Sequence, residues 1–260
     1  MNTITTFDGK FWNKQELLTK MNDDDFYFNY LGKNVLSSSS CSYLLNSPKN
    51  YKDKLVAEFN KPSPQQRIGS LVHYRILEPE KWDKIHFVDT KSVANKIYKE
   101  ALNTHKLVYL KQEKDLAEEL AYSILDNSKC LAMLRNARTE VPAISEIFDL
   151  PFRGKADILG ADYIVDLKTH TGDLKKFRWK ADDFNYDMQM YIYCTLFDIS
   201  YKNFTFLVMD KQSKSIGVFE ISKEFYNSGR RKTLDAVNIY KQYFIEKKRK
   251  VEEFYLYDVL

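Results

Sequence analysis

Asp157, Asp166 and Lys168 are close in sequence, and their spacing could bring all three side chains to one place. They lie in GKADILGADYIVDLKTH, residues 154–170. The segments RGKADIL and YIVDLK alternate as strands do, and Gly160-Ala161-Asp162 between them has the composition of a tight turn. Because alternate residues of a strand share a face, pairing across this turn would bring two carboxylates and an ammonium to one side.

Two adjacent carboxylates raise each other's pKa unless a cation lies between them. Mg²⁺, with Mn²⁺ as a substitute, suits Asp157 and Asp166, since it binds one or two carboxylates together with water and phosphate oxygens. Lys168 could orient an attacking water or stabilise charge that develops on a phosphate. This combination favours metal-assisted hydrolysis of a phosphodiester. The alternative from these residues alone is an exposed hairpin with weak ion pairs.

A helix is predicted upstream, in the segment PQQRIGSLVHYRILEPEKW, residues 64–82. Apolar residues recur there every four positions, at Ile68, Val72 and Ile76. Gly69 and His73 are also four apart and share a neighbouring face, where the glycine lets another backbone or a metal centre approach. His73 is therefore a candidate metal ligand, and a structural histidine is the alternative.

Glu146 is a further candidate acidic residue. In AISEIFD it lies between Ile144 and Phe148 on one face of a predicted strand. A carboxylate between two apolar neighbours is costly to bury without a partner. Glu146 is therefore expected either at a sheet edge or near the metal.

Basic and aromatic residues alternate directly after the hairpin, in THTGDLKKFRWKADD. The cations are Lys175, Lys176, Arg178 and Lys180, with Phe177 and Trp179 between them. Such a pattern suits phosphate contacts and base stacking on a nucleic-acid strand, and a solvated loop is the alternative. Lys155, on the face predicted for Asp157, is a further candidate for DNA contact.

A second helix is predicted from about residue 184 to 197. Gln189 and Tyr193 are four residues apart and share one face of it, where either could contact a phosphate or a base. Tyr193 could equally be a core aromatic residue with a satisfied hydroxyl. FTFLVMD and SIGVFEI then predict another hairpin, and a helix with a basic end follows in residues 234–250.

Composition sets broad limits on the class of protein. The chain has 260 residues, 44% of them hydrophobic, and a net charge of +4, which permits an anionic partner without requiring one. The three cysteines are scattered, which predicts free thiols in a reducing compartment, the cytoplasm, and no iron–sulfur cluster. Apolar stretches are too short for a membrane span. The serines before Tyr43 predict a helix N-cap, with phosphate contact as the alternative.

The expected fold is α+β, with a mixed central β-sheet flanked by helices. The order of the motifs resembles the PD-(D/E)xK nuclease superfamily. The similarity is closest to the exodeoxyribonuclease VIII (RecE-like) branch of phages and prophages, which is related to lambda exonuclease and the RecB nuclease domain. It is carried by LSSSSCSYLLNSPKNY, IGSLVHYRILEPEKW, GKADILGADYIVDLKTHTGD and QMYIY, and covers roughly residues 36 to 245.

The resemblance assigns roles by position. It implies metal-binding carboxylates at Asp157 and Asp166, metal ligation by the Leu167 carbonyl and by His73, and a catalytic Lys168. Gln189 and Tyr193 match a helix motif associated with DNA contact and active-site support, and Glu146 is a weaker match. The proline that the superfamily carries before its first acidic residue is replaced here by Ala156.

The resemblance also implies a restriction-endonuclease-like core and an activity. Residues 1–36 would form a helical N-terminal extension, and residues 37–260 a nuclease domain with a helical insertion around 92–138. The implied activity is Mg²⁺-dependent 5′-to-3′ resection of linear duplex DNA for phage-type recombination, which would place the protein in a host cytoplasm. A homo-oligomer and a single-strand annealing protein are the implied partners. An endonuclease or single-strand exonuclease on the same fold remains open, as does a DNA-binding module without turnover.

Overall fold

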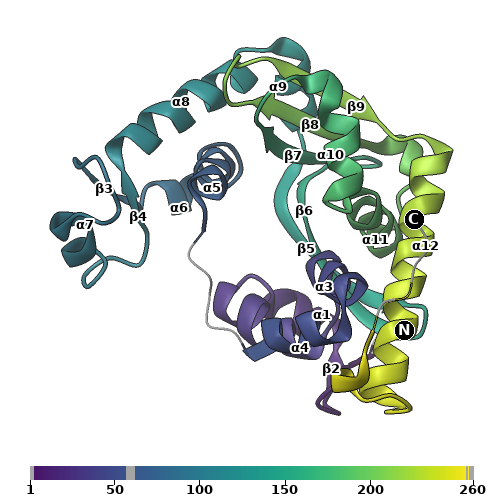
Figure 1. Cartoon of the computed structure of the whole chain (residues 1–260). Helices are drawn as coiled ribbons and strands as arrows, with labels where there is room; N and C mark the ends of the chain where they lie inside the picture. The colour runs from purple at the N-terminus through teal and green to yellow at the C-terminus, as the bar shows by residue number, and fades with distance from the viewer. Residues whose placement is uncertain (1–2, 57–61, 256, 258–260) are drawn as a thin grey trace.

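A mixed five-stranded sheet forms the centre of the molecule in the computed structural model, which describes residues 3–56, 62–255 and 257 (Figure 1). The strands, in their order across the sheet, are β5 (Arg138–Ile147), β6 (Leu150–Leu159), β7 (Ile164–His170), β8 (Phe204–Asp210) and β9 (Ile216–Glu220). Neighbouring strands are antiparallel except β7 and β8, which run parallel because a helical crossover connects them. The predicted α+β class is confirmed.

The sheet is buried on both faces. Alternate residues of its inner strands belong to two different apolar cores. Phe204, Phe206 and Val208 of β8 join one apolar core, whereas Leu207 and Met209 join the other. Successive side chains of a strand point to opposite faces, so a continuous apolar run supplies both cores. Polar residues in such strands are therefore exceptions that need partners.

Helices α11 (Tyr186–Phe197), α12 (Lys223–Tyr240) and α3 (Ser38–Asn46) cover the first face (Figure 1). Between β7 and α11 lie the short segments η2 (Leu174–Lys176) and α10 (Phe177–Asp183). Ser37 caps α3 in a capping box with Ser40, which confirms the capping interpretation of the serine run. The C-terminal helix begins earlier than residue 234 and continues beyond Tyr240 as η4 (Lys241–Ile245), a π-helical turn.

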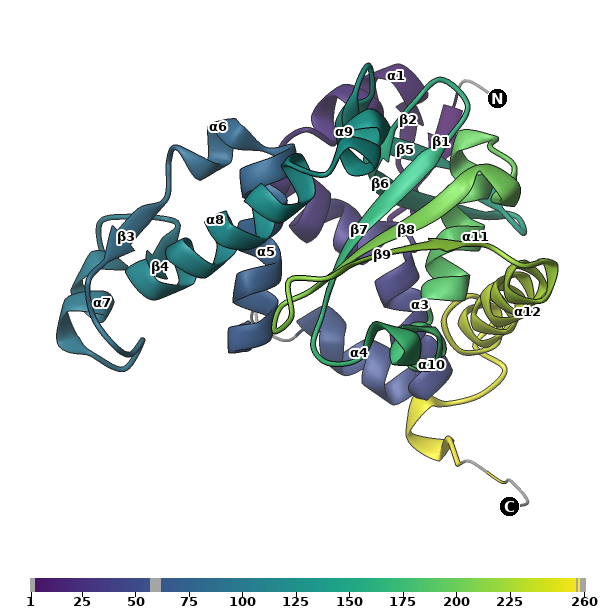
Figure 2. The same cartoon turned by 90° about the horizontal axis from the view of Figure 1, so that it is seen from above.

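Helices α5 (Pro64–Leu77), α8 (Lys111–Leu125) and α9 (Ser128–Leu134) cover the second face. An arm extends from them, made of α6 (Pro79–Trp82), β3 (His86–Val88), α7 (Lys96–Ala101) and β4 (Val108–Leu110) (Figure 2). Residues 92–138 are thus largely helical as expected, but they also contain β4, which pairs parallel with β3. Strands of three residues are too short to show a period in the sequence.

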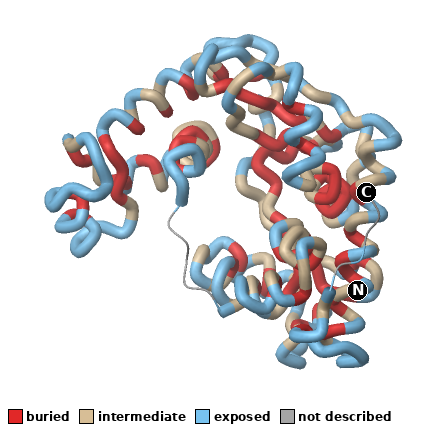
Figure 3. Tube along the Cα trace, viewed as in Figure 1, coloured by how far each residue is buried: buried red, intermediate tan, exposed pale blue. Residues whose placement is uncertain are grey.

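The N-terminal segment packs on β5. It contains β1 (Thr3–Thr5), β2 (Phe11–Asn13), α1 (Lys14–Lys20), the π-helical η1 (Phe26–Tyr30) and α2 (Leu31–Asn34). Its apolar residues surround Ile144 in a small core of their own. After α3 the chain forms α4 (Pro48–Val56), and short turns η3 (Tyr201–Asn203) and η5 (Val251–Glu253) lie further along. Figure 3 colours the chain by burial and shows buried stretches in the central sheet, in the helices that cover it and in this N-terminal segment.

No helix in the described ranges is long and apolar enough to cross a membrane.

Candidate active site

Strands β6 and β7 separate at Asp157, and this fork organises the site. The predicted hairpin is present: Ile158 pairs with Val165, Leu159 with Ile164, and the Gly160 N–H donates to the Tyr163 carbonyl at 2.9 Å. The paired register stops there. The Leu167 N–H instead donates to Oδ2 of Asp157 at 2.8 Å, so a side chain takes the place of a backbone acceptor.

His73, Glu140 and Asp157 lie close enough to share one metal ion. One candidate ligand atom from each lies within 4.8 Å of the others. His73 Nε2 is 3.6 Å from Asp157 Oδ2, and His73 Nδ1 is 3.9 Å from Glu140 Oε1. The three residues come from α5, β5 and β6, so their meeting depends on the tertiary fold.

Glu140, and not the predicted Glu146, is the β5 carboxylate that lies near the candidate metal ligands. In the β5–β6 register Thr139 pairs with Ile158 and Val141 with Ala156, which leaves Glu140 opposite Asp157, at a break in the pairing. Glu140 has a φ of 51°. Such a conformation is uncommon for a residue with a side chain and often marks a functional site.

Glu146 is at the other end of the same strand. It is exposed and pairs with Pro151, beside the turn that connects β5 and β6. Six residues of extended chain separate it from Glu140, a distance of about 20 Å. The structure therefore does not bring Glu146 to the cluster, and the edge alternative describes its position.

Asp166 and Lys168 of β7 form the second half of the site. Asp166 is fully buried, and its Oδ2 lies 2.5 Å from the Lys168 Nζ. The amide Nε2 of Gln189 donates to Asp166 Oδ1 at 2.9 Å. The buried Oδ2 of Asp166 thus has the Lys168 ammonium as its partner, so this oxygen already faces a cation.

Electrostatics couple these groups. Burial raises the pKa of Asp166 to about 6, with Lys168 opposing the rise and Asp157 adding to it. Burial also raises the pKa of Asp157, and His73 and Lys168 act against it. Burial disfavours the charged form of Lys168, yet the two aspartates outweigh it and raise the pKa of the ammonium. Lys168 therefore stays protonated at neutral pH.

His73 behaves as a cation in the absence of metal. Burial lowers its pKa, but Asp157, Glu140 and the Leu167 carbonyl outweigh burial and raise the pKa to about 9. Its Nε2 lies 2.8 Å from the Leu167 carbonyl oxygen, and the protonated ring donates to that oxygen. The proton on His73 thus supplies positive charge where a bound metal would supply it.

Gly69 lets α5 approach β7 closely enough for this contact. A Cβ at Gly69 would lie 3.0 Å from Oγ1 of Thr169, closer than such atoms normally pack. Gly69 and His73 share a face of α5, as their spacing predicts.

Tyr186 and Tyr193 line the α11 side of the site. The Lys168 Nζ lies 4.7 Å above the ring centroid of Tyr186, a cation–π geometry that sequence inspection missed. Tyr193 is buried and packs against Gly154, where a side chain on the glycine would collide with the tyrosine ring. Burial raises the pKa of Tyr193, so its hydroxyl remains protonated.

The basic candidates separate into two groups. Lys175, Lys176 and Arg178 are exposed on η2 and α10, the segment that leaves β7. Arg178 stacks its guanidinium 4.3 Å from the ring of Trp179, which is 55% exposed. Lys155 instead is mostly covered, on β6 two residues before Asp157.

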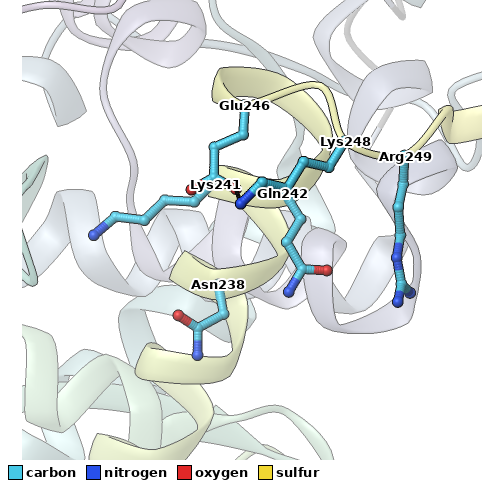
Figure 4. Close-up of a pocket in the computed structure, with 6 residues that line it drawn as sticks. All are labelled: Asn238, Lys241, Gln242, Glu246, Lys248 and Arg249. Atoms are coloured by element: carbon cyan, nitrogen blue, oxygen red, sulfur yellow. Dashed lines mark ion pairs between the residues drawn. The ribbon is translucent and has the colours of Figure 1, made fainter.

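Two surface hollows lie at the opposite end of the β5–β6 hairpin. One, of about 420 Å³, is lined by Asn238, Lys241, Gln242, Glu246, Lys248 and Arg249 (Figure 4). Its Lys241 donates to the Phe148 carbonyl at 3.0 Å, and Phe148 lines the second hollow together with Glu146. Neither hollow includes a residue of the acidic cluster.

The donor set fits a divalent metal. It offers carboxylate oxygens, the Leu167 backbone carbonyl and one imidazole, which are ligands of hard or intermediate cations. The buried Asp166 Oδ2, which faces the Lys168 ammonium, shows that a carboxylate oxygen here is paired with positive charge. Cys41, Cys130 and Cys194 are buried free thiols, and burial raises the pKa of each.

A mixed sheet flanked by helices, with acidic residues and a lysine where two strands separate, defines a PDDEXK-like nuclease fold. Residues 37–251 match the family described as a PDDEXK-like domain of unknown function (DUF3799), and the chain belongs to that family.

Solved structures agree with this fold. The chain is similar to a candidate exonuclease from Eubacterium rectale, with a TM-score of 0.65 at 15% identity, over 92% of this chain and 95% of that chain. At this identity the likeness shows the fold alone. A second structure, SSO0001, gives a TM-score of 0.31 at 15% identity over 77% of this chain and 82% of that chain, too low to support an argument. No curated protein matches the sequence significantly.

Proposed function

We propose that this chain is a Mg²⁺-dependent DNA exonuclease that hydrolyses phosphodiester bonds at the fork between β6 and β7. The observation that carries the proposal is the convergence of His73, Glu140 and Asp157 beside the buried Asp166–Lys168 pair. A carboxylate cluster with a nearby protonated lysine is the arrangement that metal-assisted phosphate chemistry needs.

Five groups would hold metal: His73, Glu140, Asp157, Asp166 and the carbonyl of Leu167. Bound metal would stabilise negative charge on the scissile phosphate and its leaving oxygen. Mn²⁺ should substitute for Mg²⁺, because carboxylate and carbonyl oxygens suit both and the imidazole suits Mn²⁺ at least as well.

The remaining residues orient the attacking water and hold the charged groups of the site in place. Lys168 donates hydrogen bonds from its ammonium and orients the attacking water in line with the phosphate. Gln189 fixes one oxygen of Asp166, and the other faces the Lys168 ammonium. Tyr186 supports the Lys168 ammonium through its ring face. Tyr193 packs behind them, and Glu146 has no role in this mechanism.

Substrate and direction follow from the motif resemblance. We propose 5′-to-3′ degradation of linear duplex DNA, as in the RecE-like branch, leaving 3′ single strands for phage-type recombination. A homo-oligomer and a single-strand annealing protein belong to the same proposal. Residues 37–260 would form the nuclease domain, with residues 1–36 as its extension. Lys175, Lys176 and Arg178 would contact the DNA.

The test uses linear duplex DNA labelled separately at each 5′ and each 3′ end, with a circular duplex as control. With Mg²⁺, the linear DNA should disappear, the circle should stay intact, and the 5′ labels should be released first. EDTA should stop the reaction. Cleavage of the circle would indicate an endonuclease instead, and preference for a single strand would indicate a single-strand exonuclease.

Lys168→Ala provides the matched inactive variant. It should cut at least about 100-fold more slowly, because one group that stabilises the transition state is removed. Folding should be retained, as judged by circular dichroism, and so should DNA binding. Full activity in this variant would contradict the site assignment, and absence of cleavage by the unaltered chain on every substrate would favour a binding module.

A further inference from the structure

Asp24, in the N-terminal segment, forms ion pairs with two lysines of the nuclease domain. Its Oδ2 lies 2.6 Å from Nζ of Lys81 in α6, and its Oδ1 lies 3.7 Å from Nζ of Lys155 in β6. One carboxylate thus bridges two ammonium groups that come from distant parts of the sequence. A phosphate group offers the same kind of anionic oxygens.

Both lysines lie beside the candidate metal ligands His73, Glu140 and Asp157. Lys155 is two residues before Asp157 on β6, and so extends from the same face of the strand. The Lys81 Nζ lies 5.8 Å from the ring centroid of Tyr74, the residue after His73.

Aromatic packing keeps the β6 cations in place without Asp24. The ring centroid of Tyr27 lies 4.8 Å from Lys155 Nζ and 4.2 Å from the guanidinium carbon of Arg153. Arg153 is buried, and its Nε has no hydrogen-bond partner among the described residues. Lys81 also pairs with Glu78, at 2.7 Å, so its ammonium keeps one carboxylate partner when Asp24 leaves.

Exposure distinguishes the carboxylate from the lysines it bridges. The Asp24 side chain is 44% exposed, against 31% for Lys81 and 13% for Lys155. A carboxylate that is both more exposed and carried by a separate segment is the member of the group that an incoming anion can replace. The ion pairs of Asp24 with these partly exposed lysines contribute only modestly to stability, so an anion that displaces Asp24 loses little free energy.

We infer that Lys81 and Lys155 form a subsite for a backbone phosphate of the DNA strand, and that Asp24 occupies this subsite in the DNA-free protein. The inference rests on the proposed function and names one of its DNA contacts. Asp24 then acts as an internal competitor: each phosphate that binds must displace it. The N-terminal segment thereby weakens DNA binding next to the catalytic cluster without touching the metal ligands.

The test measures binding of a fluorescein-labelled duplex by anisotropy in EDTA, which separates binding from cleavage. Asp24→Asn should bind about threefold or more tightly and should have a steeper salt dependence. Asp25→Asn is the matched control, because it removes the same charge one residue away, where the exposed carboxylate accepts a hydrogen bond from Asn29. Asp25→Asn should bind like the unaltered chain.

Lys81→Gln should weaken binding severalfold and reduce the salt slope by about one. Lys84→Gln, a nearby exposed lysine, is its control and should bind nearly normally. The Lys81 side chain is partly exposed, so this variant is expected to fold even if Lys155→Gln does not.

The outcomes separate the inference from the proposed function. If the unaltered chain degrades linear DNA but Asp24→Asn and Asp25→Asn bind DNA equally, the phosphate subsite is wrong and the nuclease proposal stands. Weaker binding by Asp24→Asn would show that Asp24 supports the lysines, which also overturns the inference. If the unaltered chain neither binds nor cuts DNA, both proposals fail.

Discussion

At the scale of single residues, Glu140 and Glu146 give the sharpest comparison, since they lie on the same strand. Glu140 lies opposite Asp157 within reach of one metal ion, whereas Glu146 is exposed at the hairpin end. We expect Glu140→Gln to weaken metal activation of cleavage about tenfold or more, because a charged ligand is lost. Glu146→Gln should leave it unchanged.

The measurement is the cleavage rate against Mn²⁺ and Mg²⁺ concentration for both variants. Equal effects from the two substitutions would contradict the assignment of Glu140 as a metal ligand. A larger effect from Glu146→Gln would favour Glu146, the candidate predicted from the sequence. Melting temperatures check that the variants remain folded. Glu140→Gln should be the more stable of the two without metal, because it removes one of several crowded carboxylates.

His73 gives a prediction on pH. A proton must leave this ring before either nitrogen can bind metal, and the pKa of His73 is raised to about 9. Asp166, whose pKa is about 6, is already ionised above neutrality. Metal affinity should therefore rise by up to about tenfold per pH unit from neutral pH to about 9, and then level off.

Titration calorimetry with Mn²⁺ at several pH values measures this dependence directly. Comparison in buffers of different ionisation enthalpy should show release of one proton at neutral pH. His73→Gln should bind metal more weakly and with a flatter pH profile. An identical pH profile in His73→Gln would exclude the histidine as the titrating ligand.

At the scale of elements, sequence periodicity predicted what is long and regular. The hairpin of β6 and β7, helix α5 with its Gly69–His73 face, helix α11 and the β8–β9 hairpin all match the sequence patterns. Strands β3 and β4 were missed because three residues carry no period. The early start of α12, at Lys223, was missed because its first turns contain few apolar residues.

The residues that sequence inspection missed depend on register. A two-residue turn at Phe148 and Asp149, both with positive φ, sets the pairing that leaves Glu140 opposite Asp157. The sequence pattern kept Phe148 within the strand. With the turn at Phe148 and Asp149, counting back along both strands puts Glu140 beside Asp157. Tyr186 and Asp24 meet the site only through tertiary packing, which no local pattern encodes.

Helix α5 and strand β7 give a prediction at this scale. Gly69→Ala should push α5 away from β7, because the new methyl group would crowd Oγ1 of Thr169. His73 would then lie further from the Leu167 carbonyl, and metal affinity should fall severalfold. Ala has the higher helix propensity, so the isolated helix should gain about 1 kcal/mol while the site loses affinity.

Calorimetric metal binding of Gly69→Ala tests this, with Ser70→Ala as control, since the Ser70 hydroxyl donates to the Gln66 carbonyl of its own helix. The second change Thr169→Ala removes the crowding atom and should restore affinity. Unchanged affinity in Gly69→Ala would mean that α5 tolerates the shift. Failure of Thr169→Ala to restore affinity would mean that the loss has another origin.

At the scale of the whole molecule, the metal cluster depends on how the arm is held to the sheet. Arg67 of α5 forms a buried two-point ion pair with Glu113 of α8, at 2.6 Å for each contact. It also donates to the Tyr98 hydroxyl at 2.9 Å and stacks on Tyr109. One guanidinium thus joins α5, α7, β4 and α8, and α5 carries His73.

Arg67→Met should therefore loosen the arm and the metal site together while the sheet stays folded. The unpaired Glu113 would cost about 3 kcal/mol or more, because a buried charge loses its partner. Hydrogen exchange should increase in α5, β4 and α8 but not in β7 or β8, and metal affinity should fall. Arg67→Met combined with Glu113→Leu removes the orphaned charge and should recover most of the stability. If metal affinity also recovers in the double variant, the arm acts by holding α5 in place. If exchange increases equally in β7 and β8, the arm and the sheet unfold as one unit, and the arm cannot tune the site separately.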